Sequence, residues 1–172
     1  KIGYAASSVL LIGVFLVTLG AQLRSKTYHP LLYWAVILAT STAGTTLSDF
    51  MDRTLGLGYA TGAAILASLL CAVLIYWKVT QKSLSVTHVR SSGQELLYWG
   101  AILVSNTLGT ALGDFLADSS GLGFAGGALL IAGAIALIVA AYYLTGISRV
   151  ALFWMAFVLT RPLGATGGDL LT

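Results

Sequence analysis

The stretch YWAVILATSTAGTTLSD, Tyr33 to Asp49, occurs three times in the chain without an insertion. The other two copies are YWGAILVSNTLGTALGD, Tyr98 to Asp114, and FWMAFVLTRPLGATGGD, Phe153 to Asp169. In each copy a Trp is followed six residues later by a hydroxyl side chain, ten residues later by a Gly and fifteen residues later by an Asp. Self-similarity of this kind marks a protein built from repeats. We therefore expect the three copies to act together.

The composition is strongly apolar. Of the 172 residues, 58% are hydrophobic and 9% are charged, whereas soluble domains carry about 25% charged residues. Segments with the length of a membrane span, about 20 apolar residues, cover 4–24, 31–50, 57–79, 95–116, 122–145 and 148–171. We predict an all-α integral membrane protein in which residues 1–172 form a single transmembrane domain of six helices, with the lipid bilayer as its partner.

The basic residues predict which loops are cytoplasmic. They concentrate in the loops that join spans 1–2, 3–4 and 5–6: Arg24, Lys26, Lys78, Lys82, Arg90 and Arg149. By the positive-inside rule, the loops 24–30, 78–95 and 145–150 are cytoplasmic. Because the positive charge sorts by side of the membrane, the net charge of +3 is no sign of nucleic-acid binding. Within the longest loop, the alternating run SLSVTHV is compatible with a short strand or an interfacial segment.

Each repeat combines two spans. The first, called the motif helix below, contains the seventeen-residue stretch, and a second helix follows it. Residues 27–80 and 92–146 form two repeats, residues 1–26 are the second helix of an incomplete repeat, and residues 147–172 are the first helix of another. Because two spans return the chain to the same side of the membrane, the repeats are parallel and can surround a common axis.

Two stripes run along each motif helix at positions i, i+4 and i+8. Small residues at this spacing let helices approach closely in lipid, so we expect the first stripe to pack helices. The second stripe is polar, and charged groups inside a membrane face protein or water. The packing stripe comprises Thr40, Gly44, Ser48, Ser105, Gly109, Gly113, Thr160, Gly164 and Gly168, and the polar stripe comprises Ser41, Thr45, Asp49, Asn106, Thr110, Asp114, Arg161, Ala165 and Asp169.

The charged residues of the polar stripe leave alternatives open. Each Asp of the stripe lies near the outer end of its span, where it either faces a polar interior or meets the headgroup region. Arg161 lies about half-way along its span, and we expect it to pair with an Asp of another motif helix. Asp52 and Asp118 occupy unequal positions and are predicted to be surface residues of the outer loops.

The tryptophans of the motif, Trp34, Trp99 and Trp154, each begin a span. Trp collects at membrane interfaces, so these residues are predicted to be interface anchors.

Tandem two-span repeats with a Trp early in the first span resemble a bacterial family of membrane-anchored proteins built from repeats of unknown function. The resemblance rests on the three Trp–hydroxyl–Gly–Asp copies. It implies a protein of the bacterial cytoplasmic (inner) membrane with four repeats and eight spans, of which this sequence is an excerpt. It implies no established activity.

Two functions of different classes fit these features. The first is a transporter or channel for a small hard cation, either a divalent metal ion such as Mg²⁺, Mn²⁺ or Ca²⁺ or a proton-coupled species, because such ions prefer oxygen ligands. Its ion-binding or pathway residues would be Asp49, Asp114, Asp169, Thr45, Thr110, Thr166, Asn106, Ser41 and Arg161. The alternative is a non-transporting scaffold, an oligomer or a partner subunit, in which Asp–Arg pairs are structural. No motif of a hydrolase, metalloprotease or phosphate-binding loop is present, so we do not expect an enzyme.

Overall fold

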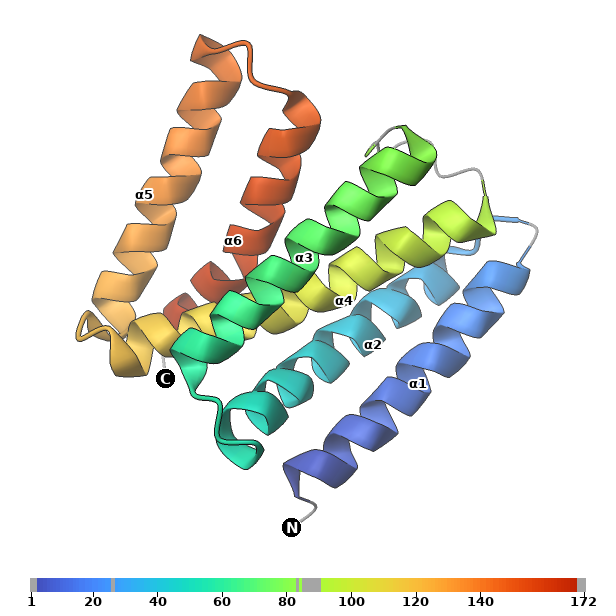
Figure 1. Ribbon diagram of the computed structural model, residues 1–172, viewed down its shortest axis with the longest axis horizontal. Helices are drawn as coiled ribbons and strands as arrows, with labels where there is room; N and C mark the ends of the chain where they lie inside the picture. Colours follow the sequence, from blue (N-terminus) through green and yellow to red (C-terminus); the bar gives the residue numbers. More distant parts are fainter. Residues whose placement is uncertain (1–2, 26, 83, 85–90, 170–172) are drawn as a thin grey trace.

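The computed structural model describes residues 3–25, 27–82, 84 and 91–169, without the side chain of Asp169. The secondary structure of this part of the chain is all helical, and it confirms the prediction of six helices long and apolar enough to cross a membrane (Figure 1). Most of the SLSVTHV run lies outside the described residues. The elements are α1 Tyr4–Arg24, α2 Pro30–Asp49, η1 Phe50–Thr54, α3 Tyr59–Gln81, α4 Ser92–Asp114, η2 Phe115–Ser119, α5 Gly123–Leu144 and α6 Arg149–Asp169, where η marks a short π-helical segment.

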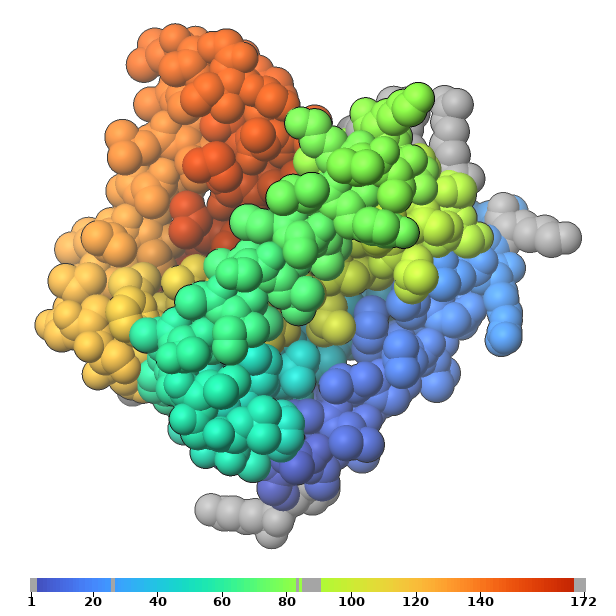
Figure 2. Space-filling model, in the orientation of Figure 1, coloured from blue at the N-terminus to red at the C-terminus, as the bar shows by residue number. Residues whose placement is uncertain are grey.

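The motif helices α2, α4 and α6 run in the same direction, and α4 packs between the other two (Figure 1). Each second helix packs on the motif helix that follows it in the chain: α1 on α2, α3 on α4 and α5 on α6. Figure 2 shows α3 lying between the α1–α2 pair and the α5–α6 pair. The second helix of one repeat therefore packs chiefly on the next repeat, which interlocks neighbouring repeats.

Glycines permit the close contacts between motif helices. A Cβ atom added to Gly44 of α2 would lie 2.9 Å from Asn106 Cβ and 3.1 Å from the Thr107 amide nitrogen of α4. A Cβ atom on Gly109 of α4 would collide with Arg161 Cβ of α6. Glycine leaves room for the neighbouring backbone at both positions, as small residues do in membrane helix pairs. The glycine of one motif helix thus faces one particular position of the next helix, occupied by Asn106 in α4 and Arg161 in α6.

The third copy of the packing stripe has no such neighbour among the described residues. Nothing lies within 4 Å of a Cβ atom built on Gly164 or Gly168. Thr160 is exposed and donates its hydroxyl to the Phe157 carbonyl oxygen of its own helix at 2.8 Å. No described helix packs on this face of α6, so the packing role of the third copy stays a prediction.

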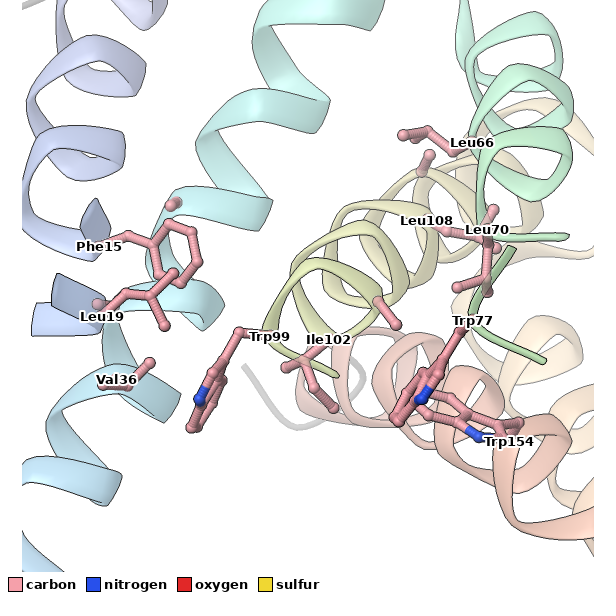
Figure 3. Packing of buried hydrophobic residues seen from close by; sticks show 14 of the residues in the cluster. Phe15, Leu19, Val36, Leu66, Leu70, Trp77, Trp99, Ile102, Leu108 and Trp154 are labelled. Carbon is pink, nitrogen blue, oxygen red and sulfur yellow. The ribbon is translucent and has the colours of Figure 1, made fainter. Parts of the chain in front are cut away.

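The tryptophans of the motif do not share one environment. Trp34 is 58% exposed, whereas Trp99 and Trp154, both labelled in Figure 3, are only 1% and 4% exposed. Trp99 packs at a tilt against Tyr33 of α2 with ring centroids 5.5 Å apart, and Trp154 contacts Trp77 of α3 with ring centroids 5.9 Å apart. The prediction of interface anchors is wrong for Trp99 and Trp154, because side chains of neighbouring helices cover both of them.

The turns that follow α2 and α4 have the same local structure. In each, a π-helical segment follows the Asp of the motif directly, and a glycine-rich turn leads into the next second helix. The backbone of Gly56 and Gly58 has φ values of +70° and +73°, and Gly121 and Gly123 repeat this at +78° and +64°. Glycine adopts this left-handed region without steric cost, which explains the spacing of the two GLG sequences.

Asp52 is buried, contrary to the prediction of a surface residue. Its side chain is 6% exposed and accepts a hydrogen bond from the Ser48 hydroxyl at 3.3 Å. Its Oδ1 atom occupies the space that a side chain at Gly62 of α3 would fill. The π-helical geometry of η1 and the missing side chain of Gly62 together place this carboxylate between η1 and α3. Asp118, in the second turn, is exposed as expected.

Candidate functional site

An open cavity of about 480 Å³ lies where the three motif helices meet. Its lining follows the polar stripe: two stripe residues come from each of the three helices. The remaining lining residues are Arg53 of η1 and two members of the packing stripe in α6. The cavity is lined by Thr45, Asp49, Arg53, Thr110, Asp114, Thr160, Arg161, Gly164 and Ala165.

Two carboxylates of the cavity come from the carboxyl-terminal ends of α2 and α4. Asp49 and Asp114 are the last residues of α2 and α4, each directly before a π-helical segment. Asp49 forms an ion pair with Arg53, whose Nε lies 3.3 Å from Asp49 Oδ1. Asp114 lines the cavity without a hydrogen bond or ion pair to any residue that the structure describes. The third predicted carboxylate, Asp169, has its side chain outside the described part of the chain.

A layer of hydrogen bonds crosses the deeper end of the cavity. Arg161 donates from Nε to Asn106 Oδ1 at 2.9 Å and from Nη2 to the Ser41 hydroxyl. Asn106 donates in turn from Nδ2 to the Thr40 hydroxyl at 3.3 Å. Ser41, Asn106 and Arg161 occupy the same position in the three copies of the motif. Equivalent positions of all three motif helices therefore converge on one point.

The expected ion pair between Arg161 and an Asp of another motif helix is not formed by the described side chains. Asp49 and Asp114 stand eight residues beyond Ser41 and Asn106 in their helices, which is about 12 Å along a helix axis. The guanidinium group instead meets the polar side chains at its own level. Among the described side chains, the partners of the Arg161 guanidinium group at the cavity are therefore neutral.

Two of the three threonines predicted as pathway residues line the cavity, and the third, Thr166, does not. Thr45 and Thr110 line the cavity and donate their hydroxyl hydrogens to carbonyl oxygens of their own helices, at 3.1 and 3.2 Å. Their hydroxyl oxygens keep lone pairs for a ligand. Thr166 is 1% exposed and donates to the Pro162 carbonyl oxygen at 2.8 Å. The prediction of Thr166 as a pathway residue is wrong, because its methyl group faces Gly127 of α5.

Arg53 is a cavity residue that the sequence analysis missed. Its position four residues after Asp49 is a spacing at which opposite charges meet on a helical surface, and this signal was present in the sequence. Ser41 and Asn106, predicted as pathway residues, are not among the residues that line the cavity; both accept hydrogen bonds from Arg161, which lines it.

The donors of the site limit its chemistry. In the described ranges, no group of three or more His, Cys, Asp or Glu side chains is close enough to hold a metal ion. The cavity offers the carboxylates of Asp49 and Asp114 together with hydroxyl oxygens, which are ligands suited to hard cations and to hydrated ions. It also presents the cationic groups of Arg53 and Arg161, which would repel a cation unless they are paired or displaced.

These features define a class: an all-helical repeat protein whose helices have the length and composition of membrane spans, with a polar cavity between equivalent helices. Residues 32–83 and 97–148 match the family described as Repeat of Unknown Function (DUF347), and the two matches together cover more than half of the chain. The chain belongs to this family. Each matched segment holds most of one motif helix and the second helix that follows it. No curated protein and no solved structure matches the chain.

Proposed function

We propose that the chain is a membrane transporter or channel for a small hard cation, such as a divalent metal ion or a cation whose movement is coupled to protons. The observation that carries the proposal is the convergence of the polar stripes of α2, α4 and α6 on one open cavity that holds two carboxylates. Ionisable groups within membrane spans are costly, and they are characteristic of ion pathways.

The roles of the lining residues follow from their pairing. Asp114 is the primary cation ligand, because it forms no direct ion pair with a described side chain. Asp49 is the second ligand and exchanges its ion pair with Arg53 for the bound cation. The hydroxyl oxygens of Thr45 and Thr110 complete a set of oxygen donors, as hard cations prefer. A cavity of about 480 Å³ has room for the ion together with retained water.

Arg161 limits passage at the deeper end. Its guanidinium group is fixed between Asn106 and Ser41. A fixed positive charge opposes the transfer of a cation beyond this layer. Transport in this proposal requires the Arg161 layer to open after the cation binds, with the arginine serving as an internal counter-ion.

The proposal includes a cellular setting. The protein is placed in the bacterial inner membrane with the loops 24–30, 78–95 and 145–150 in the cytoplasm, so the carboxylates of the cavity belong to the outer side. The sequence has a third Asp, Asp169, at the equivalent position of the third copy. The open face of α6 at Gly164 and Gly168 is the position at which a further motif helix of an eight-span protein would pack.

Thermal unfolding of the purified protein in detergent tests the cation site. A bound ion at about a hundred times its dissociation constant adds about 2.7 kcal/mol of stability. We expect Mg²⁺, Mn²⁺ or Ca²⁺ to stabilise the protein and Asp114→Asn to remove the effect. Asp118→Asn is the matched control, because Asp118 is exposed and does not line the cavity. If none of these ions stabilises the protein, or if both variants respond alike, the proposed site is wrong.

A second function, a non-transporting scaffold or partner subunit, is favoured by one observation. Arg161 connects α6 to Asn106 of α4 and Ser41 of α2 through neutral partners, as a residue that fixes helix register would do. In a scaffold, Arg161→Leu would disrupt folding or assembly, and no ion would change the stability of the wild type. The same unfolding experiment therefore distinguishes the two functions.

A further inference from the structure

A second cavity, of about 330 Å³, lies between α5 and α6 at the end of the helix pair opposite to Asp169. Its walls are apolar: Ile138 and Val139 of α5 face Leu152, Phe153 and Ala156 of α6. We call this cavity the α5–α6 groove. No polar stripe residue of the motif lines it, so the groove is separate from the candidate cation site.

One basic residue belongs to the lining of this apolar groove. The Arg149 guanidinium carbon lies 3.9 Å from the centre of the Tyr142 ring, and Nη1 donates to the Tyr142 carbonyl oxygen. These contacts fix the guanidinium group to the end of α5. Arginine has five N–H donors in a planar fork that matches phosphate oxygens. Among the described residues no carboxylate pairs with Arg149, so its charge stays available to a ligand.

The surroundings of the groove have the character of a membrane interface. Tyr143 and Leu144, at the end of α5, are 77% and 82% exposed. Tyrosine collects at the depth of the lipid headgroups, where one side of the ring is apolar and the hydroxyl is hydrated. Arg149 therefore belongs at the depth of the phosphate groups, and the apolar walls extend from there along the two helices toward the acyl chains.

We propose that the α5–α6 groove binds one anionic phospholipid, whose phosphate contacts Arg149 and whose acyl chain packs against the apolar walls. Basic pockets between transmembrane helices bind anionic headgroups in this manner. Charge complementarity selects an anionic lipid, because the ammonium group of a zwitterionic headgroup weakens the attraction to Arg149. The proposal is independent of the cation site.

Native mass spectrometry of the detergent-purified full chain tests the proposal. The wild type is titrated with phosphatidylglycerol and with phosphatidylcholine of identical acyl chains. We expect tighter retention of phosphatidylglycerol, and Arg149→Gln should weaken it about fivefold or more, as loss of one basic residue beside anionic lipid predicts. Arg24→Gln is the matched control, because Arg24 is an exposed basic residue at the end of α1 and does not line the groove.

A second variant tests the acyl-chain site without changing the charge. Ala156→Phe fills the groove and should also reduce retention of phosphatidylglycerol, while its thermal unfolding reports whether the fold is intact. Equal retention of the two lipids by the wild type, or equal retention of phosphatidylglycerol by the Arg149 and Arg24 variants, overturns the proposal. If inorganic phosphate displaces bound phosphatidylglycerol as effectively as added phosphatidylglycerol does, the acyl chain contributes nothing, and the proposal is overturned as well.

Discussion

The same Gly→Ala substitution at equivalent positions of the motif helices should have opposite effects on stability. Gly44, Gly109 and Gly164 occupy one position in the three copies. A Cβ atom at Gly109 collides with Arg161 Cβ and lies 3.2 Å from Arg161 Cγ, while one at Gly164 has nothing within 4 Å. Gly44 has an intermediate clearance, with Asn106 Cβ at 2.9 Å. The three sites therefore form an internal series in which only the packing differs.

The magnitudes follow from two terms. Alanine in place of a helical glycine stabilises a helix by about 1 kcal/mol, and this gain is common to the three variants. Overpacking a filled contact costs about 1–3 kcal/mol. The common term cancels in a comparison, so Gly109→Ala should be less stable than Gly164→Ala by about 1–3 kcal/mol. Gly44→Ala should fall between them or close to Gly109→Ala.

The measurement is reversible unfolding of the three single variants and the wild type in mixed detergent, followed by circular dichroism. Gly164→Ala serves as the control for helix propensity, because it changes the same residue type at the same position of the repeat. A destabilisation of Gly164→Ala equal to that of Gly109→Ala would refute the reasoning, and so would three variants that agree within about 0.5 kcal/mol.

Two further predictions concern buried polar contacts. Asn106→Leu removes the acceptor of the Arg161 Nε hydrogen bond and should lower the free energy of unfolding by about 1.5–3 kcal/mol, the range for hydrogen bonds to charged groups. The double variant with Arg161→Met should recover most of this loss. Additive losses in the double-mutant cycle would contradict the contact. Gly62→Ala places a Cβ atom on Asp52 Oδ1 and should cost about 1–3 kcal/mol. Asp52→Ala should relieve that cost in a thermal unfolding experiment, and an undiminished cost in the double variant would show that the two residues do not touch.

The sequence predicted the helices of this fold well because the signals are local. Apolar runs and the repeated motif define the six helices within a few residues of the structure. They do not indicate the π-helical extensions that follow Asp49 and Asp114. The packing of α3 on α4, and of α5 on α6, was not predictable in the same way. Apolar periodicity shows which face of a helix is buried and does not show which neighbour buries it.

The candidate site was predicted in part, because the spacing of polar residues along one helix is also a local signal. Helical spacing placed Asp49, Thr45, Thr110 and Asp114 on one face, and all four line the cavity. Thr166 lies one residue beyond the cavity-lining position of the third copy, so its side chain turns about 100° away toward α5.

The partner of Arg161 and the burial of two tryptophans depend on neighbouring helices. The carboxylates stand two helical turns beyond the level at which Arg161 meets Asn106, and a sequence pattern alone does not give the relative heights of different helices. Trp99 and Trp154 begin their spans as an interface residue would, and only the packing of adjacent helices buries them.

The most direct test of the proposed function is cation flux through the protein reconstituted into liposomes. Uptake of Mn²⁺ is followed with a trapped fluorescent indicator for the wild type, Asp114→Asn and Asp118→Asn. We expect uptake by the wild type and the Asp118 variant and a rate at least about tenfold lower for the Asp114 variant, since a tenfold change corresponds to about 1.4 kcal/mol at a single ligand. Equal uptake by all three proteins would contradict the role of the Asp114 carboxylate. The transport of Mn²⁺, Mg²⁺ and Ca²⁺ would be contradicted if liposomes with the wild type took up these ions no faster than empty liposomes.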